Sequence, residues 1–173
     1  MKKQLLTMLL AAPLSMLAQP RQEMTLSENW SFSHDKKEWQ SVSVPHDWAI
    51  AGPFNKKWDL QKVAIVQNGE TEATEKSGRS GALPWIGKGH YRRTINIPRK
   101  WMHAELVFDG AMAEPTVYLN GEKAGYWAYG YNAFKVDITP YMKVGDNLLE
   151  VDLQNMEESS RWYPGAGIYR PVK

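Results

Sequence analysis

The fold class is decided by one stretch, Thr116-Val117-Tyr118-Leu119-Asn120-Gly121-Glu122-Lys123-Ala124-Gly125. Its centre, Asn120-Gly121, supplies the two positive φ angles that a two-residue hairpin turn requires. The residues before the turn, Thr116-Val117-Tyr118, carry the β-branched and aromatic side chains that are enriched in strands. We therefore predict two antiparallel strands, one over 116–119 and one over 122–125.

Strand signals continue on both sides of this hairpin, and no helical period is sustained anywhere in the chain. Residues 27–48 carry large apolar side chains among polar residues, several of them two or three positions apart, which is typical of strands and turns. Proline and glycine residues separate the segments. The further predicted strands are Tyr91–Ile97, Ala104–Phe108, Phe134–Asp137 and Leu148–Leu153. Many short strands with regular turns predict an all-β fold, an antiparallel jelly-roll β-sandwich that forms one domain. Residues 67–81 lack any large apolar residue and are expected to be a surface loop.

The first 18 residues, MKKQLLTMLLAAPLSMLA, have the layout of a secretory signal peptide. Two lysines precede an apolar run that is too short to cross a bilayer, which needs ~20 residues. We expect cleavage near Ala18, a mature domain over 19–173, and no membrane anchor. The 173-residue chain has no cysteine, so export fits a bacterial periplasm or cell surface better than a disulfide-dependent secreted module.

The charge of the mature chain implies no electrostatic partner. Of the 21 basic residues, Lys2 and Lys3 precede the expected cut, which leaves 19 against the 19 acidic residues. The remaining basic pairs are scattered, whereas nucleic-acid binding needs several phosphates to be neutralised together. Nucleic acid is therefore not an expected partner.

The segment Ser159-Ser160-Arg161-Trp162-Tyr163-Pro164-Gly165-Ala166-Gly167-Ile168-Tyr169-Arg170 is the most informative for function. One cation and two aromatic rings come directly before a proline and two glycines, which favour a tight turn. Such a turn presents side chains to a partner.

This segment resembles a signature of glycoside hydrolase family 2, and the resemblance extends over almost the whole mature chain. Further matching motifs occur in register, namely Phe108–Ala111, Val117–Gly121, Tyr129–Phe134 and Asp137–Thr139. Three earlier segments, with the 67–81 loop, are similar to β-galactosidase-like members in particular, namely Val44–Trp48, Gly52–Leu60 and Leu83–Gly89. The resemblance implies the N-terminal sugar-binding sandwich of such an enzyme, with the immunoglobulin-like and barrel domains absent and the closing strand truncated at Lys173.

The resemblance also implies where the chemistry lies. Family members are retaining glycosidases, which need two carboxyl groups ~5–5.5 Å apart. Both are glutamates of the barrel, so no catalytic residue is assigned in this chain, and alone it is expected to be inactive. The expected role is a loop that leans over the active site of the barrel.

Four residues are candidates for contact with substrate, namely Arg161, Trp162, Tyr163 and Trp85. The family places a sugar-contacting side chain just before the turn, and a guanidinium donates a fork of hydrogen bonds to sugar oxygens. Alternatively, Arg161 pairs with Glu157 or Glu158 and only fixes the loop. The aromatic rings could stack on sugar or pack on the barrel.

Other polar residues are assigned structural roles. Asp47, in Pro45-His46-Asp47-Trp48, is expected to cap backbone amides. The spacing of His34, His90 and His103 does not suggest zinc. Neither a cofactor nor a metal is predicted, although a calcium site among turn residues such as Asp109, Asn120 and Asp146 is an alternative.

Three functions compete. The first is the sugar-binding domain of an exported β-galactosidase-like enzyme, with a β-galactoside or related glycan and its own further domains as partners, in a parent that could be a homo-oligomer. The second is a stand-alone lectin-like module. The third is a purely structural or assembly domain. The chain stops partway through an expected closing strand, which favours the first.

Overall fold

The computed structural model describes residues 21–50, 87–155 and 164–173. Within these ranges all regular structure is β. The eight strands are β1 (Trp30–Ser33), β2 (Gln40–Val42), β3 (Gly87–Ile97), β4 (Glu105–Phe108), β5 (Thr116–Leu119), β6 (Glu122–Tyr126), β7 (Phe134–Asp137) and β8 (Gly145–Asn155). The predicted signal peptide 1–18 and the predicted loop 67–81 lie outside the described residues.

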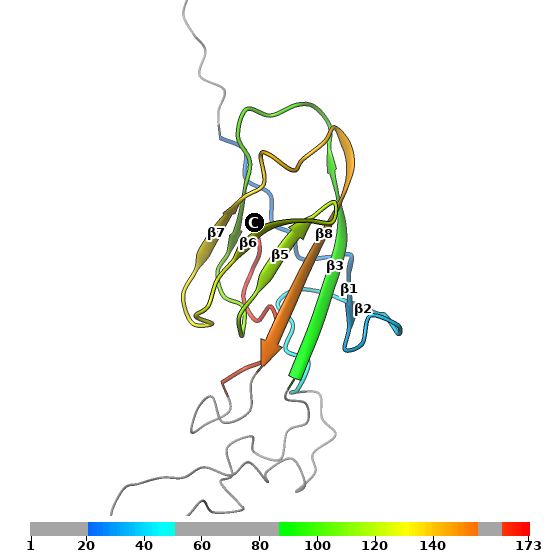
Figure 1. Ribbon diagram of the computed structural model, residues 1–173, viewed down its shortest axis with the longest axis vertical. Helices are drawn as coiled ribbons and strands as arrows, with labels where there is room; N and C mark the ends of the chain where they lie inside the picture. The colour runs from blue at the N-terminus through cyan, green and yellow to red at the C-terminus, as the bar shows by residue number, and fades with distance from the viewer. Residues whose placement is uncertain (1–20, 51–86, 156–163) are drawn as a thin grey trace, which may run out of the picture.

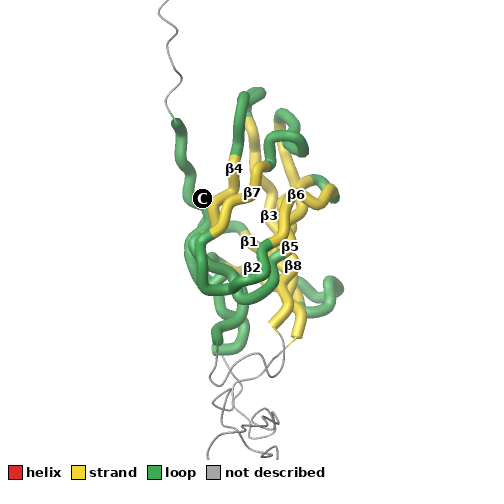
Figure 2. The backbone as a smooth tube through the Cα atoms, turned by 60° about the vertical axis from the view of Figure 1, so that its left-hand side comes forward, coloured by secondary structure: helices red, strands yellow, loops and turns green. Residues whose placement is uncertain are grey.

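The strands form two antiparallel sheets, as Figures 1 and 2 show. The larger sheet has the order β2-β1-β3-β8-β5-β6, and β4 pairs with β7 in the smaller one. Side chains of both sheets belong to one hydrophobic core. The prediction of an all-β antiparallel sandwich is confirmed.

Strands β3 and β8 form the longest ladder, with eleven residue pairs from Gly87↔Asn155 to Ile97↔Gly145. In β8 the alternate residues Leu149, Val151 and Leu153 are buried, so one face of the strand covers the core. The ladder runs the length of the sandwich (Figure 1). Its two ends therefore define the two ends of the domain.

The predicted hairpin is confirmed. β5 and β6 pair antiparallel, and the turn residues Asn120 and Gly121 have φ angles of 55° and 84°. The Asn120 side chain also fixes the hairpin to β8, because its Oδ1 accepts a hydrogen bond from the Leu148 amide at 3.1 Å. The turn thus sets both the hairpin register and its place in the sheet.

The last residues of the chain pair along β4, on the side away from β7. The amide of Lys173 donates to the Val107 carbonyl at 2.9 Å, and the reverse bond is 2.8 Å. The amide of Leu26 donates to the carbonyl of Val172 at 2.7 Å, and Val172 is fully buried. Residues 171–173 thus lie between β4 and the first described segment.

Candidate functional site

Three ends of the described segments lie at one end of the sandwich. Gly87, the first residue of β3, lies opposite Asn155, the last residue of β8. The side-chain amide of Asn155 donates to the Gly165 carbonyl at 3.4 Å. The predicted contact residues Trp85, Arg161, Trp162 and Tyr163 themselves lie outside the described residues. Their flanking residues converge at this end, which we call the loop end (bottom of Figure 1).

A carboxylate fixes the segment Pro164–Gly167, which follows Tyr163 in the sequence and is predicted as a turn. Asp47 Oδ2 accepts a hydrogen bond from the Ala166 amide at 3.1 Å, and Oδ1 accepts one from the Ala49 amide at 2.9 Å. The prediction that Asp47 caps backbone amides is confirmed, and the bond to Ala166 joins segments that are far apart in the sequence. A carboxylate that accepts two backbone hydrogen bonds is a structural anchor.

Backbone pairing adds to this anchor. The amide of His46 donates to the Ile168 carbonyl at 2.8 Å, and the amide of Trp48 donates to the Ala166 carbonyl at 3.2 Å. On its other side the segment forms a bridge with Met112, because Gly167 and Met112 exchange two hydrogen bonds of 2.9 Å. The turn is therefore held on two sides by backbone that is distant in sequence.

Gly167 occupies a position that only glycine fits. Its φ angle of 108° lies in a region that residues with a Cβ rarely adopt. A Cβ here would collide with the Tyr91 hydroxyl and would lie 2.5 Å from the His46 carbonyl oxygen. The close approach of three backbone segments at this point depends on the absence of a side chain.

His46 and Tyr91 form a polar contact beneath the turn. The Tyr91 hydroxyl lies 2.8 Å from His46 Nδ1, and burial raises the pKa of Tyr91. Phe32 packs on both rings, with centroid distances of 4.9 Å to Tyr91 and 5.1 Å to His46. Burial also lowers the pKa of His46 and of His34, so both imidazoles are neutral in the folded protein near neutral pH.

These shifts predict a loss of stability in mild acid. A histidine whose folded pKa lies below its unfolded value of about 6.5 contributes stability above that pH and loses it as the pH falls through the folded value. We expect the melting temperature to be level from pH 8 to 7 and to fall from about pH 6.5 to 5. Exposed carboxylates with a lowered pKa, such as Asp137, affect the melting temperature only at lower pH.

Replacement of His46 by glutamine should make this fall shallower, and His34→Gln should do the same. Melting temperatures measured by circular dichroism across this pH range give the comparison. If both variants keep the full drop of the unsubstituted chain, the two buried imidazoles are not its cause.

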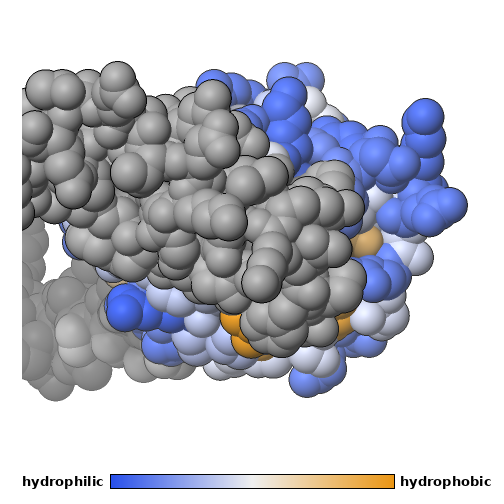
Figure 3. Space-filling model, turned by 90° about the horizontal axis from the view of Figure 1, so that it is seen from below, coloured by the Kyte–Doolittle hydropathy of each residue, from blue (hydrophilic) through white to orange (hydrophobic). Residues whose placement is uncertain are grey.

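A second feature of the loop end is the connection between β6 and β7, residues 127–133. It exposes Trp127, Tyr129 and Tyr131, and the hydroxyl of Tyr169 donates to the Gly130 carbonyl at 2.8 Å. The sequence analysis did not select these residues as site candidates. The signal that could have found them is the run of aromatic residues between two strands. In the view of Figure 3, from below, the visible described surface is mainly hydrophilic with small hydrophobic areas.

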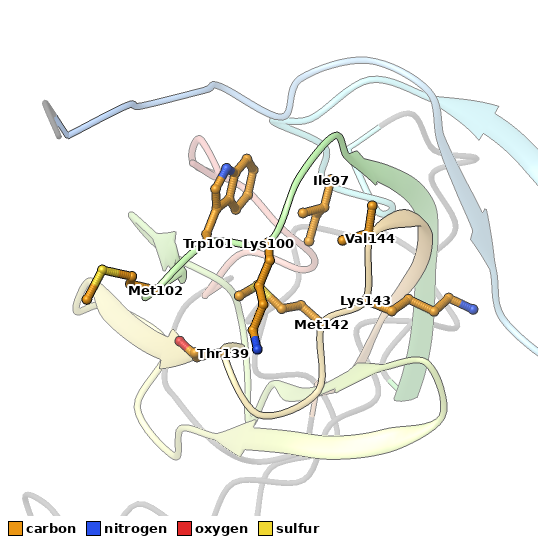
Figure 4. A pocket seen from close by; sticks show the side chains of 8 residues that line it. All are labelled: Ile97, Lys100, Trp101, Met102, Thr139, Met142, Lys143 and Val144. Carbon is orange, nitrogen blue, oxygen red and sulfur yellow. The ribbon is translucent and has the colours of Figure 1, made fainter.

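The opposite end of the sandwich carries a depression of about 600 Å³. Trp101, Met102 and Val144 line it together with Lys100 and Lys143, as Figure 4 shows. Among the described residues that line it, none carries a carboxyl or imidazole group.

Metal-ligating residues and membrane-spanning helices were considered over the described ranges 21–50, 87–155 and 164–173. In these ranges no three histidine, aspartate or glutamate side chains are grouped as metal ligands. Asn120 and Asp146, considered above for calcium, make protein contacts: Asn120 contacts Leu148, and Asp146 accepts a hydrogen bond from Asn96 at 2.7 Å. The same part of the chain has no helix of the length and apolarity that a membrane span requires.

Comparison with known families gives one match over most of the chain. The family model described as "Glycosyl hydrolases family 2, sugar binding domain" matches residues 15–173. The match includes both the loop end and the depression at the opposite end.

Individual relatives agree with this match. The chain is 34% identical to the β-galactosidase BoGH2A of Bacteroides ovatus, over 91% of this chain and 18% of that protein. It is 31% identical to a putative β-glucuronidase of Formosa agariphila, over 88% of this chain and 14% of that protein. A crystal structure of a β-glycosidase from Bacteroides vulgatus superimposes with a TM-score of 0.65 at 31% identity, covering 86% of this chain and 19% of that one. The chain thus spans less than a fifth of the length of each of these relatives.

Proposed function

Because this chain belongs to glycosyl hydrolases family 2 and matches its sugar-binding domain, we propose that it serves an exported, retaining β-galactosidase-like enzyme as its sugar-binding and scaffolding domain. In this proposal the loop end contributes Arg161, Trp162, Tyr163 and Trp85 to an active site whose two catalytic glutamates lie on a separate barrel domain. The expected substrate is a β-galactoside or a related glycan.

The observation that carries the proposal is the anchoring of the segment Pro164–Gly167. Asp47, the His46 backbone and Met112 all hold this turn. A group that orients substrate must be fixed closely if it is to lower the barrier, because small misplacements are costly. A firmly held turn directly after Arg161-Trp162-Tyr163 supports a positioning role for these residues. Its convergence with Gly87, two residues after Trp85, supports the inclusion of that tryptophan.

Export is part of the proposal and depends on residues 1–18. A cleaved signal there would deliver the protein to the bacterial periplasm or cell surface, where glycans are accessible. Detection of a mature N-terminus near Gln19 in the secreted or periplasmic fraction would support it, and retention of Met1 in the cytoplasm would contradict it.

The test uses the complete open reading frame that contains this chain. We expect its product to hydrolyse 4-nitrophenyl β-D-galactopyranoside and the 173-residue chain alone to show no hydrolysis, because the acid and the nucleophile are not in it. The β-glucuronide of the same phenol is assayed beside it, since relatives of both kinds match. A reading frame that ends at Lys173 would favour the lectin-like alternative.

Replacement of Arg161 by alanine in that complete product should reduce kcat/KM about ten- to hundredfold, because a charged hydrogen bond to substrate contributes ~1.5–3 kcal/mol. The melting temperature should change little. Arg99→Ala, an exposed arginine outside the loop end, is the matched control and should leave kcat/KM unchanged. A large loss of melting temperature with near-normal kinetics would instead assign Arg161 to fixing the loop.

A further inference from the structure

Three aromatic rings form a parallel stack that runs from the core to the surface. Phe108 is fully buried, and its ring lies 4.8 Å from that of Phe134 at an interplanar angle of 1°. The ring of Phe134 lies 6.0 Å from that of Trp127 at 8°. The side chain of Phe134 is 5% exposed and that of Trp127 is 39% exposed. Trp127 is therefore the outermost ring of a stack that begins in the core.

The ring of Trp127 is parallel to that of Phe134 and is the most exposed of the three. The backbone on both sides of this ring contact is also fixed. The backbone amide of Trp127 donates to the Pro115 carbonyl at 3.0 Å, and Phe134 begins strand β7. A flat apolar face that is already ordered loses little conformational entropy when a ligand covers it.

The surroundings of Trp127 are aromatic and carry hydroxyl groups. Tyr129 and Tyr131 follow in the same connection, with ring centroids 5.4 Å apart, and both are exposed. Gly130 lies against Met112 with no room for a Cβ, and its carbonyl accepts the Tyr169 hydroxyl. Since Met112 also bridges Gly167, the connection is tied to the anchored turn of the loop end. Tyr126 is excluded from this surface because Lys123 lies over its ring, 5.6 Å from the centroid.

We propose that Trp127 is a stacking platform for one hexopyranose ring of a β-linked oligosaccharide, at a position outside the pocket in which the glycosidic bond is cut. This inference rests on the proposed function. A pyranose ring presents a flat face of C–H groups bordered by hydroxyls, which suits stacking on an apolar indole ring, and the exposed Tyr129 and Tyr131 of the same connection carry hydroxyl groups. A protein partner would instead need a contact of about 800 Å² on each side, whereas this surface is a few rings in one connection.

The test uses the 173-residue chain labelled with 5-fluorotryptophan and observed by ¹⁹F NMR. The resonance of Trp127 is the one that Trp127→Phe removes. Titration with β-1,4-galactotetraose should shift this resonance with a millimolar dissociation constant, and maltotetraose, an α-linked glucan, should shift it less. If no β-linked oligosaccharide shifts it, the proposal is wrong.

Variants separate a binding role from a structural one. Binding is followed by backbone amide shifts, and Trp127→Ala should weaken it about tenfold, whereas Trp127→Phe, which keeps a flat ring, should stay within about threefold. Trp101→Ala, at the opposite end of the sandwich, is the matched control and should bind normally. Equal binding by Trp127→Ala and the unsubstituted chain would overturn the proposal.

The outcome is distinguishable from that of the proposed function. Hydrolysis of 4-nitrophenyl β-D-galactopyranoside by the complete product involves a single sugar ring and should not respond to Trp127→Ala, whereas kcat/KM for the tetraose should fall. If Trp127→Ala lowers neither the hydrolysis of the nitrophenyl galactoside nor that of the tetraose, the stacking platform is contradicted and the proposed function is not. A ¹⁹F resonance of Trp127 in the complete product that no sugar can shift would identify the ring as a contact between domains and would also overturn it.

Discussion

Replacement of Gly167 by alanine is expected to lower the free energy of unfolding by about 3–5 kcal/mol, which is much of the stability of an ordinary domain. Two costs add at this position. The φ angle of 108° is strained for any residue with a Cβ. The added Cβ would also lie 2.5 Å from the His46 carbonyl oxygen, and backbone cannot move aside as a flexible side chain can. The bridge to Met112 should open, and the anchored turn should be released.

The matched control is Gly121→Ala. Gly121 also has a positive φ angle, 84°, but no atom lies within 4 Å of the position that a Cβ would take. This variant carries the conformational cost alone, about 1 kcal/mol. Urea unfolding of the two variants gives the difference directly. Similar midpoints for both would show that the backbone approach at Gly167 relaxes easily, and that the turn is held less firmly than the hydrogen bonds indicate.

Replacement of Phe108 by alanine should cost about 3–5 kcal/mol. The side chain is fully buried, and its ring supports that of Phe134 in the stack that ends at Trp127. Removal would leave a cavity between β4 and β7, beside the bridge to Val172. The support of Trp127 should loosen as well, so the variant is expected to bind β-1,4-galactotetraose more weakly than its remaining folded fraction would predict.

Tyr126→Ala provides the comparison for Phe108. Tyr126 is an exposed aromatic residue on β6, so its loss should cost less than about 1 kcal/mol, from the contact with Lys123. Thermal and urea unfolding measure both variants. A Phe108→Ala domain that is as stable as Tyr126→Ala would mean that the core repacks around the missing ring.

The strands could be predicted because their side chains repeat with a period of two between glycine and proline residues. The turn at Asn120-Gly121 shows this best, because asparagine and glycine are the residue types that most readily adopt the two positive φ angles of such a turn. The predicted strand over 91–97 begins earlier, at Gly87, because pairing with Asp152–Asn155 continues the ladder. Gly89 lies in this extension against Trp48, where a side chain would not fit, so local propensity argued against a strand that the sheet imposes.

The candidate site was predictable only where one segment carries the whole signal. The turn after Tyr163 and the capping role of Asp47 follow from local residue types, but the bond from Ala166 to Asp47 depends on the folded topology. The exposure of Trp127 could not be predicted from the sequence for the same reason. Tryptophan is highly buried on average, and only the positions of Phe134 and Phe108 in the folded chain show that Trp127 lies at the outer end of a ring stack.

The β3–β8 ladder has a consequence for the folding rate. Its nearest paired residues, Ile97 and Gly145, are about 50 residues apart in the chain, so a large loop must close before the first pair can form. Such non-local pairing places folding in the range of milliseconds to seconds. Residues 51–86 and 156–163 lie outside this closing loop in the sequence, so insertions or deletions there leave its length unchanged. Evolution can therefore vary the segments that contain Trp85 and Arg161 without slowing formation of the longest ladder.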